Sequence, residues 1–536
     1  MLRSSSGVVA AVAGALTPAR CWTRRSAGGA LAMRQQLARW CGDELSLRLE
    51  RQRMARRLER LSYWQWWKRQ QQTWQQQQRR QKQEQRRRGV PSLAAGTLAT
   101  VSGTATAEGE SGATEMVPAH HVYSGDGRRR VGFRNPWDSA RPDAGMLGFL
   151  RVLREWDTAR SRVSTAELQA LADASCRPDF EAVQQLPTDE PGLAATWIGH
   201  AAFILQFPGT IADMDGATNA PATSTPQFTT VWTDPVFGER ASPFRFMGPR
   251  RLVPAHPRDA CPLPDIVCFS HNHYDHLDVG TVRGLVQRSR RLGRRITWLC
   301  PLGVGALLRD TDAFFGGHVP REHDVIELDW FDEVTVGCIK FVLTPAQHTS
   351  GRGLLDRNGT LWGGWAMIHQ PTDTRCYFAG DTAYRVVDRG DAGYPYPSEE
   401  QRREAAAQGR RAACPAFAEI GKRYGPFDLA LLPIGAYSPR WFMSRVHVDP
   451  TDAVAIHADV RARASIGMHH STFVLTDEGL RDPLRRLERA RQAAGLSEHQ
   501  FMTLQHGETR LFTRSTADKK EPDGERTDLP PDARAD

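Results

Sequence analysis

Short apolar runs separated by Gly, Pro and Asp turns dominate the chain from about residue 195 onward. Apolar runs of about four to eight residues, bounded by such turn residues, are typical of β-strands. The segments that fit this pattern are ATWIGHAAFILQF, VWTDPVF, DIVCFS, ITWLC, VIELDW, VTVGCIKFVLTPAQH, LWGGWAMIH, RCYFAGD, DLALLPIG and SIGMHH. We predict that each contains a strand.

Helical periodicity appears between some of these strands, around residues 278–292, 415–423, 450–461 and 476–494. Long β-runs come first, and strands then alternate with helices, which indicates two sheets with helices outside them. No internal sequence repeat is visible. The predicted fold class is therefore α/β (α+β), in one domain over residues 119–515 followed by a disordered tail over residues 516–536.

The first 42 residues contain six Arg, several Ser and no acidic residue. This composition is typical of a mitochondrial transit peptide, so we predict a mitochondrial protein. A secretory signal built on VVAAVAGAL and a basic tail without a targeting role remain alternatives. No later run approaches the roughly 18 apolar residues of a spanning helix, so contact with an intracellular membrane would be peripheral.

Residues 43–118 form a basic segment followed by a linker. Residues 43–88 are rich in Gln and Arg and include Trp64, Trp66, Trp67 and Trp74. Arg and Trp together suit an anionic membrane surface. Binding of RNA, or a solvated helix without a partner, would also explain them. Residues 91–118, rich in Ala, Gly, Thr and Ser, are a predicted flexible linker.

Charge and cysteine content narrow the class of protein. Of the net charge of +9, residues 1–88 hold +15 and the remainder about −6, so the basic character belongs to the N-terminal segment. Nucleic acid is therefore not an expected partner of the folded domain. The nine cysteines are odd in number and widely spaced, without a C-x-x-C pair. This argues against a disulfide framework or a thiolate zinc site and indicates a reducing compartment.

Three histidines and an aspartate crowd into FSHNHYDHLD, residues 269–278. His271, His273, Asp275 and His276 follow the apolar run DIVCFS and precede a helical pattern, so we expect them on a loop at a strand end. Imidazole and carboxylate groups are metal ligands. One ion does not accept all four comfortably, so two adjacent metal ions are expected.

Further ligands should come from later strand ends, because a scaffold can aim several strand ends at one point. Three candidates each follow an apolar run: His348 after FVLTPAQ, Asp381 after YFAG and His469 after SIGM.

The pattern H-x-H-x-D-H followed by distant His, Asp and His resembles the metallo-β-lactamase superfamily, which implies a four-layer αβ/βα sandwich with a dinuclear zinc site. Over roughly residues 130–512 the chain also resembles N-acyl phosphatidylethanolamine-hydrolysing phospholipases D. The similar blocks are TWIGHAAFILQF, TDPVFGERASPFRFMGPRR, SHNHYDHLD, TPAQH, FAGDTAY, AFAEIGKRYGPFDLALLPIGAYSPRWFM and HVDPTDAVAIH. The parts GAYSPRWFM and HVDP narrow the resemblance to this family.

The resemblance implies two zinc ions per chain. His271, His273 and His348 would hold one ion. Asp275, His276 and His469 would hold the other, and Asp381 would bridge the two. The family's ligand stands four residues before a Phe, which favours His469 over its neighbour His470. Asp278 and His200 are candidates for orienting the ligands.

The resemblance also implies hydrolysis of N-acylphosphatidylethanolamine to N-acylethanolamine and phosphatidic acid at a membrane surface. Zinc lowers the pKa of bound water to about 7 and would supply a nucleophile for phosphorus. Candidate catalytic residues are Asp275 and Asp381, together with His447 in HVDP and His506 in QHGE, which would bind phosphate or donate a proton. A homodimer is possible for such a chain.

Two other classes remain open, namely a nuclease or lactonase of the same superfamily and a non-catalytic scaffold tethered to membranes. Loss of a metal ligand would favour the scaffold, and all seven positions are filled. Residues 210–228 and 385–413 look like insertions relative to the family. Because the second follows Asp381 and Thr382, we expect it to reshape the mouth of the site.

Overall fold

The computed structural model describes residues 118–514, apart from residues 138, 141–150, 153, 155–161, 187–189, 210–227, 245, 312–315, 354–355 and 388–412. These residues belong to one compact unit that spans residues 110–536. The predicted transit peptide, the basic segment, the C-terminal tail and most of both predicted insertions lie outside the described residues.

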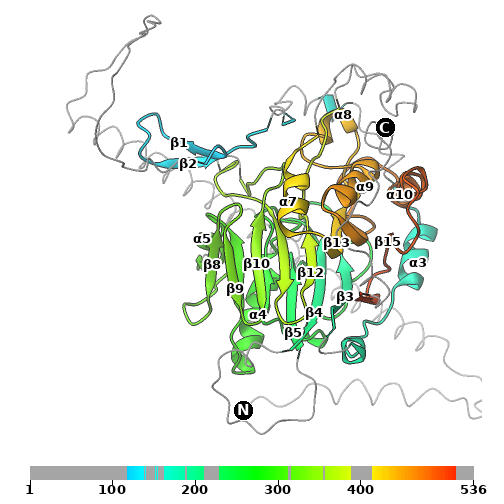
Figure 1. Ribbon diagram of the computed structural model, residues 1–536, viewed down its shortest axis with the longest axis horizontal. Helices are drawn as coiled ribbons and strands as arrows, with labels where there is room; N and C mark the ends of the chain where they lie inside the picture. The colour runs from blue at the N-terminus through cyan, green and yellow to red at the C-terminus, as the bar shows by residue number, and fades with distance from the viewer. Residues whose placement is uncertain are drawn as a thin grey trace, which may run out of the picture. The chain divides into compact units, whose positions relative to one another are not determined.

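Two seven-stranded sheets form the body of this unit (Figure 1). The first sheet has the order β16 (Thr509–Thr513), β3 (Gly192–Gly199), β4 (Ala202–Pro208), β5 (Phe228–Thr233), β6 (Ile266–Cys268), β7 (Thr297–Pro301) and β8 (Val325–Leu328). The second has the order β15 (Phe501–Thr503), β14 (Ala462–Met468), β13 (Phe427–Pro433), β12 (Thr374–Phe378), β11 (Gly364–His369), β10 (Ile339–Thr344) and β9 (Glu333–Val336).

Each sheet has an antiparallel half and a parallel half. In the first, pairing is antiparallel from β16 to β5 and parallel from β5 to β8. In the second, it is antiparallel from β9 to β12 and parallel from β12 to β15. The two sheets therefore share the same strand pattern. The sequence did not reveal this, because it has no visible repeat.

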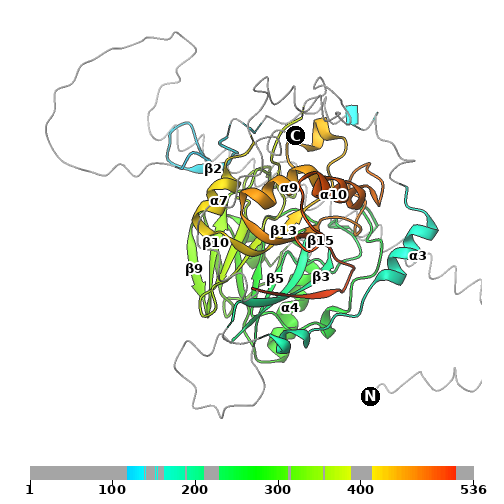
Figure 2. The same ribbon diagram turned by 45° about the vertical axis from the view of Figure 1, so that its right-hand side comes forward.

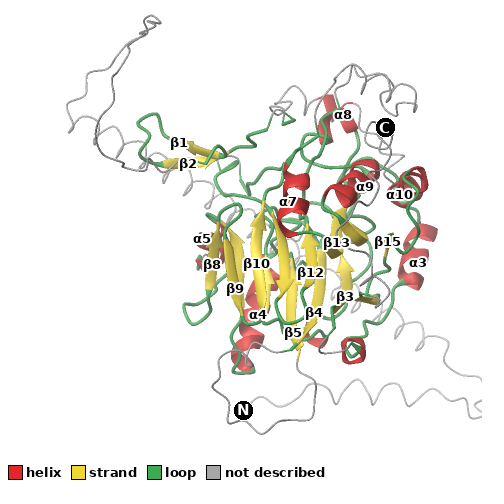
Figure 3. Cartoon of the chain, viewed as in Figure 1, coloured by secondary structure: helices red, strands yellow, loops and turns green. Residues whose placement is uncertain are grey.

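The two sheets and the helices outside them form four layers, with an apolar core between each layer and the next. Figures 2 and 3 show the helices on both outer sides of the paired sheets. The central core lies between the sheets and joins residues such as Phe203 of β4 and Phe341 of β10. A second core packs α4 (Val279–Arg291) and α5 (Val304–Arg309) on the first sheet. A third packs α7 (Ala416–Tyr424), α9 (Pro450–Asp459) and α10 (Asp482–Ala493) on the second.

This architecture confirms the predicted αβ/βα sandwich. The strands read as apolar runs because helices cover the outer face of each sheet and the partner sheet covers the inner face, so every residue of β3, β4 and β13 is buried. Burial of apolar surface on both faces is the main source of stability for such a fold.

Local turns decide where the predicted segments break. The run ATWIGHAAFILQF forms two strands, because His200 takes a positive φ of 58° and turns β3 into β4. The helix predicted over residues 476–494 begins only at Asp482. Before it, Glu478 accepts hydrogen bonds from the backbone N–H groups of Ala436 and Ser438, which holds this segment against the loop after β13.

Smaller elements complete the described part of the chain. They are a hairpin of β1 (His121–Tyr123) and β2 (Arg130–Phe133), the helices α3 (Thr165–Ala174) and α8 (Arg440–Met443), and the 3₁₀ turns Ala182–Gln185 and Arg258–Ala260. All seven described cysteines are free thiols. Within the residues described, we find no helix with the length and apolar content needed to span a membrane.

Candidate metal centre

The candidate ligands stand just after the ends of four strands from both sheets. The loop after β6 carries His271, His273, Asp275 and His276 and leads into α4, whose N-cap is Asp278. The other three follow strands of the second sheet, His348 after β10, Asp381 after β12 and His469 after β14. The structure thus brings together residues that lie up to about two hundred positions apart in the chain.

One group of three imidazoles comprises His271, His273 and His348, whose ligand atoms all lie within 4.8 Å of one another. The Nε2 atom of His271 is 2.8 Å from Nδ1 of His273. The Nε2 atom of His348 is 3.3 Å from the same Nδ1. Three nitrogen donors converge here on one point, as three protein ligands of a zinc ion do.

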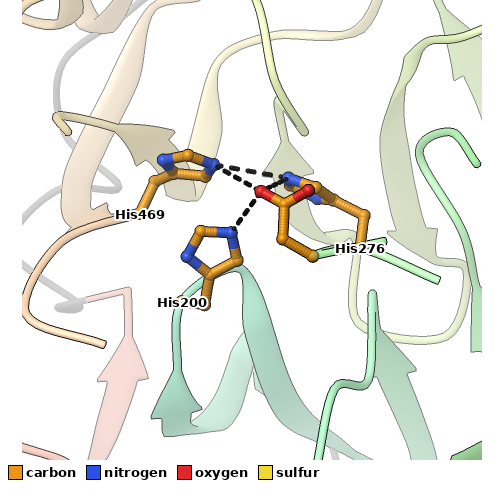
Figure 4. Close-up of side chains that lie close together, drawn as sticks. His200, His276 and His469 are labelled. Atoms are coloured by element: carbon orange, nitrogen blue, oxygen red, sulfur yellow. Dashed lines mark hydrogen bonds and ion pairs between the residues drawn. The ribbon is translucent and has the colours of Figure 1, made fainter. Parts of the chain in front are cut away.

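A second group gathers around the carboxylate of Asp275. Figure 4 shows His200, His276 and His469 with ring nitrogens turned toward one carboxylate oxygen. The Nε2 atoms of His200, His276 and His469 lie 3.0, 3.5 and 3.6 Å from Oδ2 of Asp275. His200, which was expected to orient a ligand, contacts the proposed ligand Asp275.

Asp381 lies between the two groups. Its Oδ2 atom is 3.1 Å from Nε2 of His276 and 3.6 Å from Nε2 of His348. Its Oδ1 atom is 3.1 Å from Nε2 of His469 but has no partner with hydrogen-bond geometry, although the side chain is only 2% exposed. A buried carboxylate oxygen without such a partner fits a position that coordinates a metal ion.

The protonation states suit metal ligands. Burial lowers the pKa of His271 well below its usual value, that of His273 to about 4 and that of His348 to about 3, so these imidazoles are neutral. Burial alone would raise the pKa of Asp381, but His276, His469 and His447 hold it well below its usual range. Neutral imidazole and ionised carboxylate are the forms that bind metals.

Asp275 and Asp381 shift the pKa of two of the surrounding imidazoles. Burial opposes a charge on His276, but Asp381 and Asp275 raise its pKa well above the usual value. For the same reason, against the effect of burial, the pKa of His469 is raised to about 9. The site therefore has two carboxylates that need positive charge, which a divalent ion supplies on binding.

Groups behind the ligands fix their orientation. The Nδ1 atom of His276 lies 2.7 Å from Oδ2 of Asp234, which also accepts from the hydroxyl of Ser270. The Nδ1 atom of His348 lies 2.8 Å from the carbonyl oxygen of Val446. Such partners hold the tautomer that leaves Nε2 free for the metal. The sequence reasoning missed Asp234, which directly follows the apolar run VWT and lies in the family-like block TDPVFGERASPFRFMGPRR.

The structure separates the two adjacent histidines 469 and 470. His469 faces the carboxylates, whereas His470 packs on Trp197 with ring centroids 4.8 Å apart and places its Nε2 3.3 Å from the carbonyl oxygen of Gly467. The carboxylate of Asp278 caps α4 by accepting from the N–H of Gly280, and it also accepts from the N–H of Gly238 in the segment after β5.

The two further catalytic candidates lie in different places. His447 borders the centre, with Nε2 3.9 Å from Oδ2 of Asp381, and burial lowers its pKa to about 3. His506 lies behind His200. Its Nε2 is 3.1 Å from the hydroxyl of Thr472, which accepts from the backbone N–H of His200 at 2.7 Å. His506 thus connects to the ligands through Thr472.

Comparisons with known proteins agree with this geometry. A family model described as a β-lactamase superfamily domain matches residues 229–390 and 410–470. The fold and the clustered ligands define a metal-dependent hydrolase of the metallo-β-lactamase superfamily.

A narrower family follows from relatives. The chain is 36% identical over 334 residues to N-acyl-phosphatidylethanolamine-hydrolyzing phospholipase D 1 of Caenorhabditis elegans, covering 60% of this chain and 76% of the relative. The chain therefore belongs to the N-acyl-phosphatidylethanolamine-hydrolyzing phospholipase D family, as its motifs indicated.

Two other relatives show how far the similarity extends. An uncharacterized protein of Mycobacterium tuberculosis is 35% identical, over 56% of this chain and 64% of its own length. The mitochondrial N-acyl-phosphatidylethanolamine-hydrolyzing phospholipase D of Saccharomyces cerevisiae is 29% identical, over 53% of this chain and 52% of its own length. Both similarities cover little more than half of this chain.

Proposed function

We propose that the chain is a zinc-dependent phospholipase D that hydrolyses N-acylphosphatidylethanolamine to N-acylethanolamine and phosphatidic acid. The observation that carries the proposal is the position of Asp381 between two groups of metal ligands, in a chain 36% identical to a relative named for this reaction. A pair of adjacent cations suits a phosphodiester, which is anionic and gains further negative charge as the attacked phosphorus adds a fifth oxygen.

Seven residues would hold two zinc ions. His271, His273 and His348 would bind one, and Asp275, His276 and His469 the other, with Asp381 shared between them. When bound, such a pair supplies a water-derived nucleophile at neutral pH and neutralises charge on the phosphate. The donor set supports zinc over calcium or magnesium, because it is rich in imidazole, whereas those ions prefer oxygen ligands.

His447 is suited to contact the phosphate. It is 9% exposed beside Asp381, and its Nδ1 atom has no hydrogen-bond partner among the described residues. Because its pKa is lowered to about 3 by burial, the imidazole is neutral at pH 7 and has one N–H to donate. We assign His447 a hydrogen bond to a phosphate oxygen or to the leaving alcohol.

His506 has a different proposed role. It does not touch a ligand side chain, and it acts through Thr472 on the backbone of His200, whose Nε2 in turn lies 3.0 Å from Asp275. The ring also stacks on Trp197 at 4.6 Å. We therefore assign His506 a positioning role, in which it keeps His200 and through it Asp275 in place.

The proposed location is mitochondrial, with peripheral binding to a membrane surface. The Arg-rich, acid-free composition of residues 1–42 supports this, and the related yeast protein is named mitochondrial. The Arg- and Trp-rich residues 43–88 would add electrostatic attraction to anionic lipid.

Hydrolysis in oxygen-18 water tests the reaction. Attack at phosphorus breaks the bond to the ethanolamine oxygen, so the label should enter phosphatidate and be absent from the hydroxyl of N-acylethanolamine. Chelator should abolish turnover and added zinc should restore it. Free fatty acid as the main product, label in the alcohol, or cleavage of RNA without action on the lipid would each contradict the proposal.

A further inference from the structure

A second cluster of metal-binding side chains lies outside the candidate centre. It joins the β1–β2 hairpin to the residue that follows β8, and it comprises His120, His121 and Asp329. Their ligand atoms all lie within 4.8 Å of one another. The cluster contains no candidate ligand of the hydrolase site.

Two imidazoles meet the two oxygens of one carboxylate here. The Nε2 atom of His120 is 2.7 Å from Oδ1 of Asp329, and the Nε2 atom of His121 is 2.7 Å from Oδ2. The side chains of His120, His121 and Asp329 are only 9%, 7% and 18% exposed. His120 lies in the turn that precedes β1, and His121 is the first residue of β1, so the change from turn to strand lets both imidazoles reach the same carboxylate.

A hydrogen bond accounts for the contact of His120 with Asp329 but not for that of His121. His120 forms a hydrogen bond with Oδ1, which also accepts from the backbone N–H of Trp330 at 2.8 Å. The buried Nε2 atom of His121, by contrast, has no partner with hydrogen-bond geometry despite its short distance to Oδ2. Neighbouring ligand atoms of one zinc ion, each about 2.0–2.2 Å from it, lie roughly 3 Å apart, so the distance of 2.7 Å between Nε2 and Oδ2 fits two atoms that face one cation.

The surroundings make the cluster rigid. His120 stacks on Trp330 with ring centroids 4.1 Å apart, and Trp330 stacks on Trp137 at 5.3 Å. The indole of Trp330 also donates to the carbonyl oxygen of Trp362 at 2.6 Å. Rigid, apolar surroundings reduce the reorganisation that metal binding needs.

The hairpin leads directly to a ligand of the hydrolase centre. Asn135, two residues after β2, donates from Nδ2 to the carbonyl oxygen of His348 at 2.9 Å and accepts from the His348 backbone N–H at 3.2 Å. Ser139 donates to the side chain of Gln347 at 2.7 Å. Fixing the hairpin therefore fixes the segment that holds the His348 loop.

We propose that His120, His121 and Asp329 form a separate metal site that binds a divalent transition-metal ion, with zinc as the natural probe. Two imidazoles and one carboxylate suit such an ion, and water would complete its coordination. Its role is structural, because it ties the β1–β2 hairpin to the end of β8 and stabilises the segment that clamps His348.

Metal stoichiometry tests this site without relying on activity. The purified full-length protein is stripped with chelator, dialysed to equilibrium against micromolar zinc, and its metal content is measured by mass spectrometry. His121→Ala should bind one zinc fewer per chain than the wild type, whatever the number held by the hydrolase centre. The exposed His499, altered to Ala, is the matched control and should leave the zinc content unchanged.

A second variant separates metal binding from hydrogen bonding. Asp329→Asn keeps an oxygen that can accept from Trp330 but loses the negative charge, so it should also bind one zinc fewer. In the wild type, zinc should slow hydrogen exchange of the amides of residues 121–133, and both variants should lose this protection. Equal zinc content in wild type and variants, or exchange that zinc does not alter, would reduce the cluster to a hydrogen-bonded contact and overturn the proposal.

Discussion

The Nδ1 atom of His276 lies 2.7 Å from Oδ2 of Asp234, and both side chains are fully buried. Asp234 follows β5 and His276 follows β6, two strands that pair in parallel. The contact fixes the ring so that Nε2 points to Asp275 and Asp381. A carboxylate in this position raises the basicity of the imidazole as a ligand.

Replacing Asp234 by Asn should weaken zinc binding by roughly 10-fold to 100-fold, since loss of such a partner costs about this much. Activity should fall at limiting zinc and recover in excess zinc. Competition with a fluorescent chelator gives the affinity. Glu322→Ala is the control, because it removes an exposed carboxylate that pairs with Arg290 outside the centre and should leave zinc affinity unchanged. Equal affinity in Asp234→Asn and wild type would remove Asp234 from the site.

Asp381→Asn should abolish turnover while the protein remains folded. The amide oxygen cannot neutralise two cations, and the protein should lose at least one zinc ion. Circular dichroism reports the fold, elemental analysis the metal, and product formation the activity. A fully active Asp381→Asn enzyme would show that this carboxylate is not shared between two metal ions.

His447→Gln should lower kcat by about 100-fold, the size expected for a group that donates to the reacting phosphate. Zinc content should stay at the wild-type value, because His447 is not among the proposed ligands. A change confined to KM would indicate that His447 binds the substrate equally in ground and transition states. Loss of zinc in the variant would instead make His447 a ligand.

The stability of the fold should depend on pH through His506. Burial, with Arg251 and His470 adding to it, lowers the pKa of this imidazole to about 3. The folded state therefore stays neutral while the unfolded chain takes up a proton below about pH 6.5. The contribution of the neutral His506 to the unfolding free energy is complete above pH 6.5 and is lost as the pH falls from there toward 3.

His506→Gln removes this pH-dependent contribution to the unfolding free energy. Between pH 8 and pH 5 the variant should lose about 2 kcal/mol less unfolding free energy than the wild type. Urea unfolding of both metal-free proteins at the two pH values gives the difference. Parallel pH dependence in both proteins would mean that His506 is not held neutral by the fold.

Removal of residues 43–88 should reduce hydrolysis of lipid in anionic vesicles more than hydrolysis of detergent-dispersed lipid. The segment concentrates positive charge, and its attraction to an anionic surface should weaken as salt rises. Rates on vesicles and micelles, at low and high salt, provide the test. Equal losses on both substrates would leave this segment without a role at the membrane.

Much of the fold could be predicted because its strands are short, apolar and bounded by turn residues. The run DIVCFS predicted β6, and the ligand loop at its end followed from the same pattern. Strand-end positions pointed to His348, Asp381 and His469, and the family resemblance then implied how the ligands are shared between two zinc ions. Asp234 was missed because a lone Asp after a strand is a common turn residue, and only the pairing of β5 with β6 places it beside His276.

The sequence by itself determined the residue types of the candidate centre, its strand-end positions and the family of the chain. The tertiary structure decided which of two adjacent histidines faces the carboxylates, that Asp381 lies between two groups, and that His506 contacts Thr472. It also brought His120 and His121 to Asp329, about two hundred residues away. Sequence patterns report local periodicity and composition, whereas side-chain direction and long-range proximity depend on how the two sheets pack.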